Sequence, residues 1–304
     1  MKRLWSSAIE HISVEKLWIL FTVGPVIALL LAIGFIPMGY AIWLSFHSKD
    51  PFMPTVDFVG LKNYITLFTN PKFLASLGRS LQYTTVSVAF QTLIGLGIAL
   101  LFVRPFRGKL LARTVVFLPY LIPTAVVGLI FSWLLSTQYG VVNQLLRQLG
   151  LIRFPITFFD GLKSAMYSVI GAGSWKFGMF CTLMFIARLQ AIPKNLYEVA
   201  QVSGAGAFQC FLDVTLPHLK STLLLIVLLR GIWMFNKFDM LWILTKGGPL
   251  RVTETLPIFS YRIAFEERSF GLAAAASVVI LLILVIFATL YFWYFKPSKE
   301  VEVE

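Results

Sequence analysis

The sequence predicts an all-α integral membrane protein that crosses the bilayer about six times. Of its 304 residues, 58% are hydrophobic and only 13% are charged, which is the composition of a chain whose outer surface faces lipid. Four stretches contain no Asp, Glu, Lys or Arg, and each is longer than the roughly 20 residues that a spanning helix needs. They run over residues 17–48, 80–103, 114–146 and 269–295.

Two further stretches are apolar enough to span the membrane but contain isolated charges. They run over residues 164–188 and 219–245. Away from their ends, where Arg188 and Lys220 lie, they are interrupted by Lys176, Arg230, Lys237 and Asp239. Backbone polar groups must be satisfied inside hydrocarbon, and the chain has no alternating ten-residue segments, so we expect a helical bundle rather than a barrel. Prolines inside the first and third stretches predict kinks; they are Pro25, Pro37, Pro119 and Pro123.

The short connection between the second and third stretches is strongly basic. It contains Arg104, Arg107, Lys109 and Arg113, and short loops rich in Lys and Arg stay on the cytosolic side of a membrane. This orientation puts both termini in the cytosol, together with the polar segment 189–217. The longer connections are expected on the outer side, at residues 47–79, 138–163 and 246–268.

The polar segment 189–217 is amphipathic and lies between two predicted spans. Two short helical patterns flank a glycine centre at Gly204 and Gly206, where the chain can bend. Phe208 belongs to the second apolar stripe, and Pro217 marks entry to the fifth span. Large apolar side chains on a cytosolic loop need to be covered, either by the chain's own helices or by a groove in a partner subunit.

The spacing inside this segment resembles the EAA loop of ATP-binding-cassette importer permeases. That loop has Glu, a second Ala, Gly, Leu and Pro at fixed intervals, and the matching residues here are Glu198, Ala200, Gly204, Leu216 and Pro217. The segment departs from the pattern conservatively, at Val199, Ser203 and Val214. The resemblance implies that the segment sits in a cleft of a separate ATPase, anchored by charge-assisted hydrogen bonds of Glu198. The residues expected to couple the two subunits are Glu198, Val199, Ala200, Gly204, Ala205, Phe208, Leu216 and Pro217.

A second block resembles the carbohydrate branch of these permeases, the maltose and glycerol-3-phosphate type. It contains Phe-Asp at 238–239, Leu-Thr-Lys-Gly-Gly-Pro at 244–249 and Tyr-Arg-Ile-Ala-Phe at 261–265. In that branch the pattern belongs to the first of two unlike permease subunits, so a second permease is implied. The similarity covers nearly the whole chain, from Pro25 to Phe287.

The resemblance also implies an architecture and a set of partners. The fold would be the type I importer permease fold in the bacterial cytoplasmic (inner) membrane, with a cytosolic tail over residues 1–16, a first transmembrane helix and outer loop over 17–75, a transmembrane type-1 core over 76–296 and a second cytosolic tail over 297–304. The implied partners are a second permease subunit in a heterodimer, two ATPase subunits, an extracytoplasmic solute-binding protein, a sugar and membrane lipid. No cofactor is expected on this chain, because ATP and magnesium belong to the partner ATPase.

The sequence lacks the motifs of ATP hydrolysis, metal binding and nucleophilic catalysis. The pair Gly108-Lys109 lacks both the preceding glycine and the following Ser or Thr of a Walker A loop. The histidines lie in unrelated segments, without metal-ligand or nucleophile motifs; they are His11, His47 and His218. The net charge is +12, but the basic residues are dispersed rather than interleaved with aromatic residues, which argues against nucleic acid. We therefore expect neither catalysis, nor a metal site, nor nucleic-acid binding.

Two other classes of membrane protein compete with the importer permease. A secondary transporter of a small solute needs carboxylates or broken helices at mid-membrane, and the only acidic residue inside a predicted span is Asp239. A membrane-embedded enzyme would need a paired acid, a histidine cluster or a nucleophile elbow. Both alternatives are therefore weaker than the importer permease.

Ionisable residues at mid-membrane usually face a bundle interior or a wet cavity. The expected substrate path therefore runs beside Trp175, Lys176, Arg230, Trp233, Asn236 and Lys237. On a continuous helix, Arg230, Trp233 and Lys237 share one face, whereas Asp239 points away from Lys237. Indole rings stack on sugars, and the polar groups can bond hydroxyls or an acidic group. Alternatively, these charges pair with the second permease, or Lys237 extends outward to the membrane surface.

Overall fold

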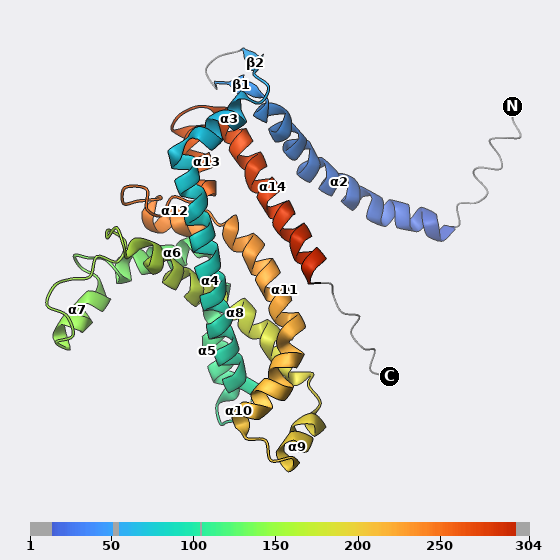
Figure 1. Ribbon diagram of the computed structural model, residues 1–304, viewed down its shortest axis with the longest axis vertical. Coiled ribbons are helices and arrows are strands. Elements are labelled where there is room, and N and C mark those ends of the chain that lie inside the picture. Colours follow the sequence, from blue (N-terminus) through green and yellow to red (C-terminus); the bar gives the residue numbers. More distant parts are fainter. Residues whose placement is uncertain (1–13, 51–54, 104, 296–304) are drawn as a thin grey trace, which may run out of the picture. The chain divides into compact units, whose positions relative to one another are not determined.

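The computed structural model describes residues 14–50, 55–103 and 105–295 (Figure 1). The predicted tails at 1–16 and 297–304 therefore lie outside the described residues, apart from residues 14–16 at the start of the first helix. The basic residue Arg104 is also outside them.

Helices dominate the described residues, as predicted. They are α2 (Val14–Ser45), α3 (Lys62–Thr69), α4 (Pro71–Val103), α5 (Lys109–Leu121), α6 (Thr124–Leu134), α7 (Val141–Gln148), α8 (Ala165–Gln190), α9 (Lys194–Val202), α10 (Ala207–Cys210), α11 (Leu216–Phe235), α12 (Asp239–Thr245), α13 (Leu256–Phe265) and α14 (Phe270–Tyr294). A π-helical segment, η1 (Phe211–Thr215), joins α10 to α11. Two short antiparallel strands, β1 (His47–Lys49) and β2 (Val56–Phe58), add a hairpin to the first predicted outer loop.

Five of the described helical segments are long and apolar enough to cross a membrane, and α5 with α6 makes a sixth if the bent pair is one span. The two helices of that pair meet at an angle of 99°. Ile122 and Pro123 both have extended backbone, with ψ of 134° and 141°. The residue before a proline is pushed out of the helical region, so Pro123 breaks the third span, whereas Pro119 stays inside α5.

The fifth predicted span, residues 219–245, is also not one continuous helix. Helix α11 ends at Phe235, and α12 starts only at Asp239. The Asp239 carboxylate accepts a hydrogen bond from the Met240 N–H at 2.9 Å, and a negative side chain at a helix start is favourable. At its other end the span begins earlier than predicted, because the helix is continuous from Ala207 through η1 into α11. Pro217 therefore lies inside this helix rather than at its entrance.

The chain divides into two compact units. The first comprises residues 1–67 and 263–278, and the second comprises residues 68–262 and 279–304. In the first unit the Asn63 amide donates to the carbonyls of Ser45 and His47 at 2.8 and 3.0 Å. The hydroxyls of Tyr64 and Ser45 lie 2.6 Å apart. These contacts tie α3 to the end of α2 and to the hairpin.

In the second unit α4, α8 and α11 lie side by side (Figure 1). Helices α4 and α8 approach closely at Gly95, where an added Cβ would lie 2.6 Å from the Cys181 Cβ and 3.0 Å from the Thr182 nitrogen. Small residues allow membrane helices to pack closely. Van der Waals contacts in such packing stabilise helix association in lipid, where the hydrophobic effect does not drive it. The neighbouring Ala99 is fully buried in the same interface.

We predict that Gly95→Ala destabilises the protein, because an extra methyl group in this contact forces α4 and α8 apart. Overpacking of this kind costs about 1–3 kcal/mol, and it should lower the thermal unfolding midpoint in detergent. The matched control is Gly97→Ala on the same helix, where an added Cβ meets no atom within 4 Å. If the two variants unfold at the same temperature, the close packing at Gly95 is not needed.

Candidate functional site

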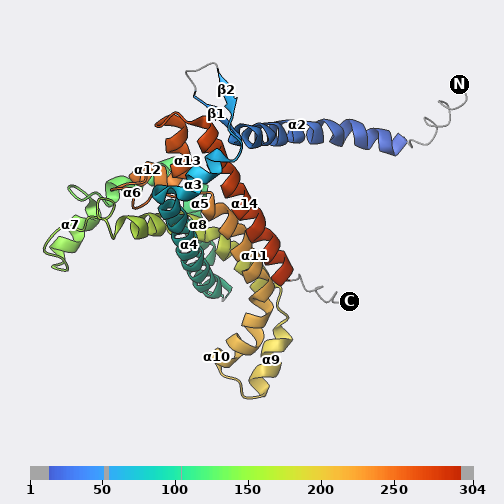
Figure 2. The ribbon, with the colours of Figure 1, turned by 45° about the horizontal axis from the view of Figure 1, so that its top comes forward.

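The predicted coupling segment forms two short helices, α9 and α10, that project beyond the ends of α8 and α11 (Figure 2). Helix α9 ends in a left-handed glycine, Gly204, with φ of +85°. The Ala205 N–H donates to the Ala200 carbonyl and the Gly204 N–H donates to the Gln201 carbonyl, both at 3.0 Å. This is the Schellman arrangement, which ends a helix sharply and favours glycine at this position. The predicted bend at Gly204 is therefore present.

The inner face of α9 is fastened to the membrane helices. Leu196, Tyr197 and Ala200 pack against the buried cluster that α8 and α11 share. The Tyr197 hydroxyl lies 3.0 Å from the Thr215 hydroxyl, and Arg188 donates from Nε to the His218 carbonyl at 2.9 Å. Ala200 is thus small because it lies close to the chain's own helices, and the loop is held as a rigid extension of them.

The outer face of the loop is apolar and uncovered in this chain. The exposed fractions are 65% for Val199, 90% for Val202 and 73% for Phe208, and Glu198 is exposed beside them. We call these four residues the outer face. Of the other predicted coupling residues, Gly204, Leu216 and Pro217 are exposed, whereas Ala200 and Ala205 are half-buried. Large apolar side chains left exposed on one short loop usually mark a surface that another molecule covers.

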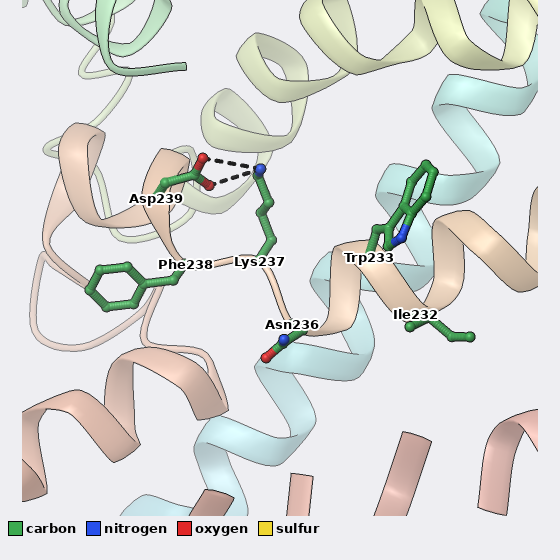
Figure 3. A pocket seen from close by; sticks show the side chains of 6 residues that line it. All are labelled: Ile232, Trp233, Asn236, Lys237, Phe238 and Asp239. Carbon is green, nitrogen blue, oxygen red and sulfur yellow. Dashed lines mark hydrogen bonds and ion pairs between the residues drawn. The ribbon is translucent and has the colours of Figure 1, made fainter. Parts of the chain in front are cut away.

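The end of α11 lines an open pocket of about 430 Å³. Figure 3 shows its residues, which are Ile232, Trp233, Asn236, Lys237, Phe238 and Asp239. The ammonium of Lys237 and the carboxylate of Asp239 form an ion pair at 2.9 Å. The expectation that Asp239 points away from Lys237 is wrong, because α11 has already ended and the two residues are not on one helix.

Arg230 lies next to this pocket but does not line it, and it is only 2% exposed. Its guanidinium donates to the Gln91 side-chain oxygen of α4, from Nε at 2.9 Å and also from Nη2. Sequence reasoning did not single out Gln91. A signal for it exists, because buried polar residues recur every three or four positions along α4; they are Ser76, Ser80, Tyr83, Ser87 and Gln91.

Lys176 also lies outside the pocket, and it has a partner set of its own. It is 5% exposed and donates to the carbonyls of Pro119 and Tyr120, both at 3.3 Å, and to that of Ile122. These carbonyls belong to the last turn of α5, where the third span breaks. A cation at a helix C-terminus bonds the orphan carbonyls and offsets the negative end of the helix dipole. Its neighbour Trp175 is half-exposed and packs edge-on against Phe131 at 5.4 Å.

The predicted path residues therefore do not form one site. Trp233, Asn236 and Lys237 come together at the pocket, Arg230 lies behind it, and Trp175 and Lys176 lie along α8. Figure 3 shows the side chains of Trp233 and Lys237 extending to one side of the chain and that of Asn236 to the other. Each of the three cations has partners inside this chain.

Long apolar helices that pack side by side, with a two-helix loop projecting beyond their ends, are the features that the sequence predicts for a membrane permease. Residues 91–296 match the family described as binding-protein-dependent transport system inner membrane component, and the chain belongs to that family. Two of its relatives are the trehalose/maltose transport system permease protein MalF of Thermococcus litoralis and the inner membrane ABC transporter permease protein YcjO of Escherichia coli K12. The first is 32% identical over 237 residues, which cover 78% of this chain and 80% of the relative. The second is 36% identical over 244 residues, which cover 79% and 80%.

A solved structure has the same fold. It is the bacterial alginate ABC transporter in complex with alginate pentasaccharide-bound periplasmic protein, and the matching chain superimposes with a TM-score of 0.79 at 22% identity. The match covers 95% of this chain and 96% of the other. The predicted fold, an ABC importer permease with six spans, is confirmed when the bent pair α5 and α6 is taken as one span.

We predict that Lys176→Met lowers the stability of the protein at the broken third span. Methionine fills similar space but leaves the α5 carbonyls without their donor, and unsatisfied buried polar groups cost about 1–3 kcal/mol. The unfolding midpoint of the purified protein in detergent should fall accordingly. Lys176→Arg is the control, because it keeps the charge and the hydrogen-bond donors, so its unfolding midpoint should fall less. A Lys176→Met variant as stable as the wild type would contradict the assignment.

Proposed function

We propose that this chain is the permease subunit of an ATP-driven importer of a sugar or sugar derivative, coupled to a separate ATPase through the segment 189–217. The observation that carries the coupling is the outer face, an exposed apolar surface on a loop that is rigidly attached to the membrane helices. The sugar substrate is supported by the relatives, one of which is named for trehalose and maltose transport.

The proposed partners are those that the resemblance to importer permeases implies. A second permease subunit, two ATPase subunits and an extracytoplasmic binding protein complete the importer, and ATP and magnesium reside on the ATPase. The outer face would fill a groove of the ATPase, in the way that an amphipathic helix lays its apolar side into a groove. Both termini and this loop face the cytosol in the proposed orientation, which rests on Arg107, Lys109 and Arg113 between α4 and α5.

The geometry suggests how motion of the loop reaches the pocket. The helical segment Ala207–Phe235 is continuous and 29 residues long, which corresponds to about 44 Å at 1.5 Å per residue. Its first turn belongs to the loop, and its last turn carries Trp233 at the pocket. A movement of the ATPase groove would therefore reach the pocket end through one continuous helix.

The secondary transporter receives little support. Within the described parts of α4, α5, α6, α8, α11 and α12, Asp239 is the one carboxylate, and Lys237 pairs with it. Proton or sodium coupling usually needs a carboxylate that gains and loses its partner at mid-membrane.

We predict that Glu198→Lys uncouples transport while the protein still inserts. A charge-assisted contact is worth about 1.5–3 kcal/mol, and reversal adds repulsion, so association with the ATPase should weaken at least roughly tenfold. Copurification of the ATPase and uptake of the sugar check this. The matched control is Glu267→Lys, the same charge change at an exposed residue outside the segment. Normal copurification and uptake with Glu198→Lys would remove Glu198 from the docking surface.

We also predict that Gly204→Leu abolishes substrate-stimulated ATP hydrolysis. An added Cβ at Gly204 meets no atom of this chain within 4 Å, so the damage must come from the partner groove or from backbone strain at positive φ. Gly204→Ala separates the two, because it adds the same strain of about 1–2 kcal/mol with little bulk. We expect the alanine variant to hydrolyse ATP and the leucine variant to fail; equal activity would show Gly204 to be a spacer.

A further inference from the structure

Three cationic groups surround one phenyl ring inside the second unit. Phe177 of α8 is 8% exposed, and its ring centroid lies 5.6 Å from Lys176 Nζ, 5.4 Å from Arg230 Cζ and 4.2 Å from Lys237 Nζ. The two longest of these distances limit the separation of any two cationic centres to about 11 Å. The charges therefore act together on the surrounding space, although they come from different turns of the chain.

The described part of the bundle does not balance these charges. Asp239 is the one carboxylate in α4, α5, α6, α8, α11 and α12, and it pairs with Lys237. Lys176 is bonded to backbone carbonyls, and Arg230 to the neutral amide of Gln91. Dipoles and aromatic faces stabilise a cation without cancelling its charge. Three positive groups thus face one negative group in a medium where charge is expensive.

The pocket at the end of α11 borders this cluster. Lys237 and Asp239 line it (Figure 3), and the Lys237 side chain is 18% exposed. Arg230 lies 5.7 Å from the ring centroid of Trp233, and Trp233 is itself 44% exposed at the pocket. The pocket therefore combines an aromatic surface with a positive potential that the buried Arg230 and Lys176 reinforce from behind.

We propose that this pocket binds an anionic sugar, one that carries a carboxylate or another acidic group. The acidic group approaches Lys237 in competition with Asp239, while the sugar ring packs against the exposed part of Trp233. Arg230 and Lys176 do not touch the sugar, and they act through the potential that they add at low dielectric. This inference rests on the proposed function and narrows its substrate class.

The test uses the permease purified with its partner subunits in lipid nanodiscs, without the binding protein. The probes are maltose and the same disaccharide with one C6 hydroxymethyl group oxidised to a carboxylate, so that size and shape are matched. Affinities come from calorimetry. We expect the acidic probe to bind on the order of tenfold more tightly than maltose at low salt, and the advantage to shrink at 1 M salt because screening is stronger.

Two substitutions with opposite expected effects sharpen the test, and a third serves as the control. Lys237→Gln should lower the ratio of acidic to neutral affinity on the order of tenfold. Asp239→Asn should raise this ratio, because the acidic sugar no longer competes with the Asp239 carboxylate for Lys237. Lys220→Gln is the control, since Lys220 is an exposed cation on the same helix, ten residues from Arg230; its ratio should equal that of the wild type. The increase with Asp239→Asn cannot arise from damaged folding.

Two outcomes would overturn the inference, and they differ in what they say about the proposed function. The first outcome is that both probes bind equally to the wild type and that neither Lys237→Gln nor Asp239→Asn changes the ratio of acidic to neutral affinity. The pocket then does not select an acidic sugar, but the proposal that the protein belongs to a sugar importer is unaffected. If neither probe binds, and neither stimulates ATP hydrolysis when a binding protein loaded with it is added, the sugar substrate itself fails.

Discussion

The need to satisfy backbone carbonyls in a medium without water is the constraint on which the membrane part of this chain depends. The third span breaks at Ile122 and Pro123, and the broken end requires donors that lipid cannot supply. Lys176 of α8 provides them. Helix α8 is itself packed closely against α4 at Gly95. The broken helix end and the buried cation are therefore parts of one solution.

The same helices connect the proposed coupling segment, residues 189–217, with the pocket at the end of α11. Tyr197 ties the inner face of α9 to Thr215 of η1, and Arg188 of α8 ties α8 to His218 of α11. The continuous helix that follows reaches the pocket at Trp233. Apolar burial on the inner side leaves Val202 and Phe208 for a partner on the outer side. A loop with one face fixed and one face free is suited to transmitting a movement.

Much of this arrangement could be predicted from residue order, because charge-free runs and left-handed glycines depend on local sequence. The apolar spans and the bend at Gly204 are confirmed, except that the fifth span is Ala207–Phe235 rather than 219–245 and the third is broken between α5 and α6. The Lys237–Asp239 pair was predicted wrongly, since helical periodicity was extended past Phe235, where α11 ends. The Arg230–Gln91 contact and the carbonyl partners of Lys176 could not be predicted, because they join residues far apart in sequence through tertiary packing. The roles of the coupling and path residues stay predictions.

The central claim is that an ATPase covers the outer face of the loop, and cysteine labelling of Val202→Cys tests it most directly. The native cysteines, Cys181 and Cys210, are 0% and 7% exposed, so a water-soluble maleimide should react mainly at the new site. We expect the labelling rate to fall at least roughly tenfold when the ATPase is assembled, whereas Phe154→Cys, exposed in another loop, reacts unchanged. A Val202→Cys rate that is the same with and without the ATPase would contradict the account.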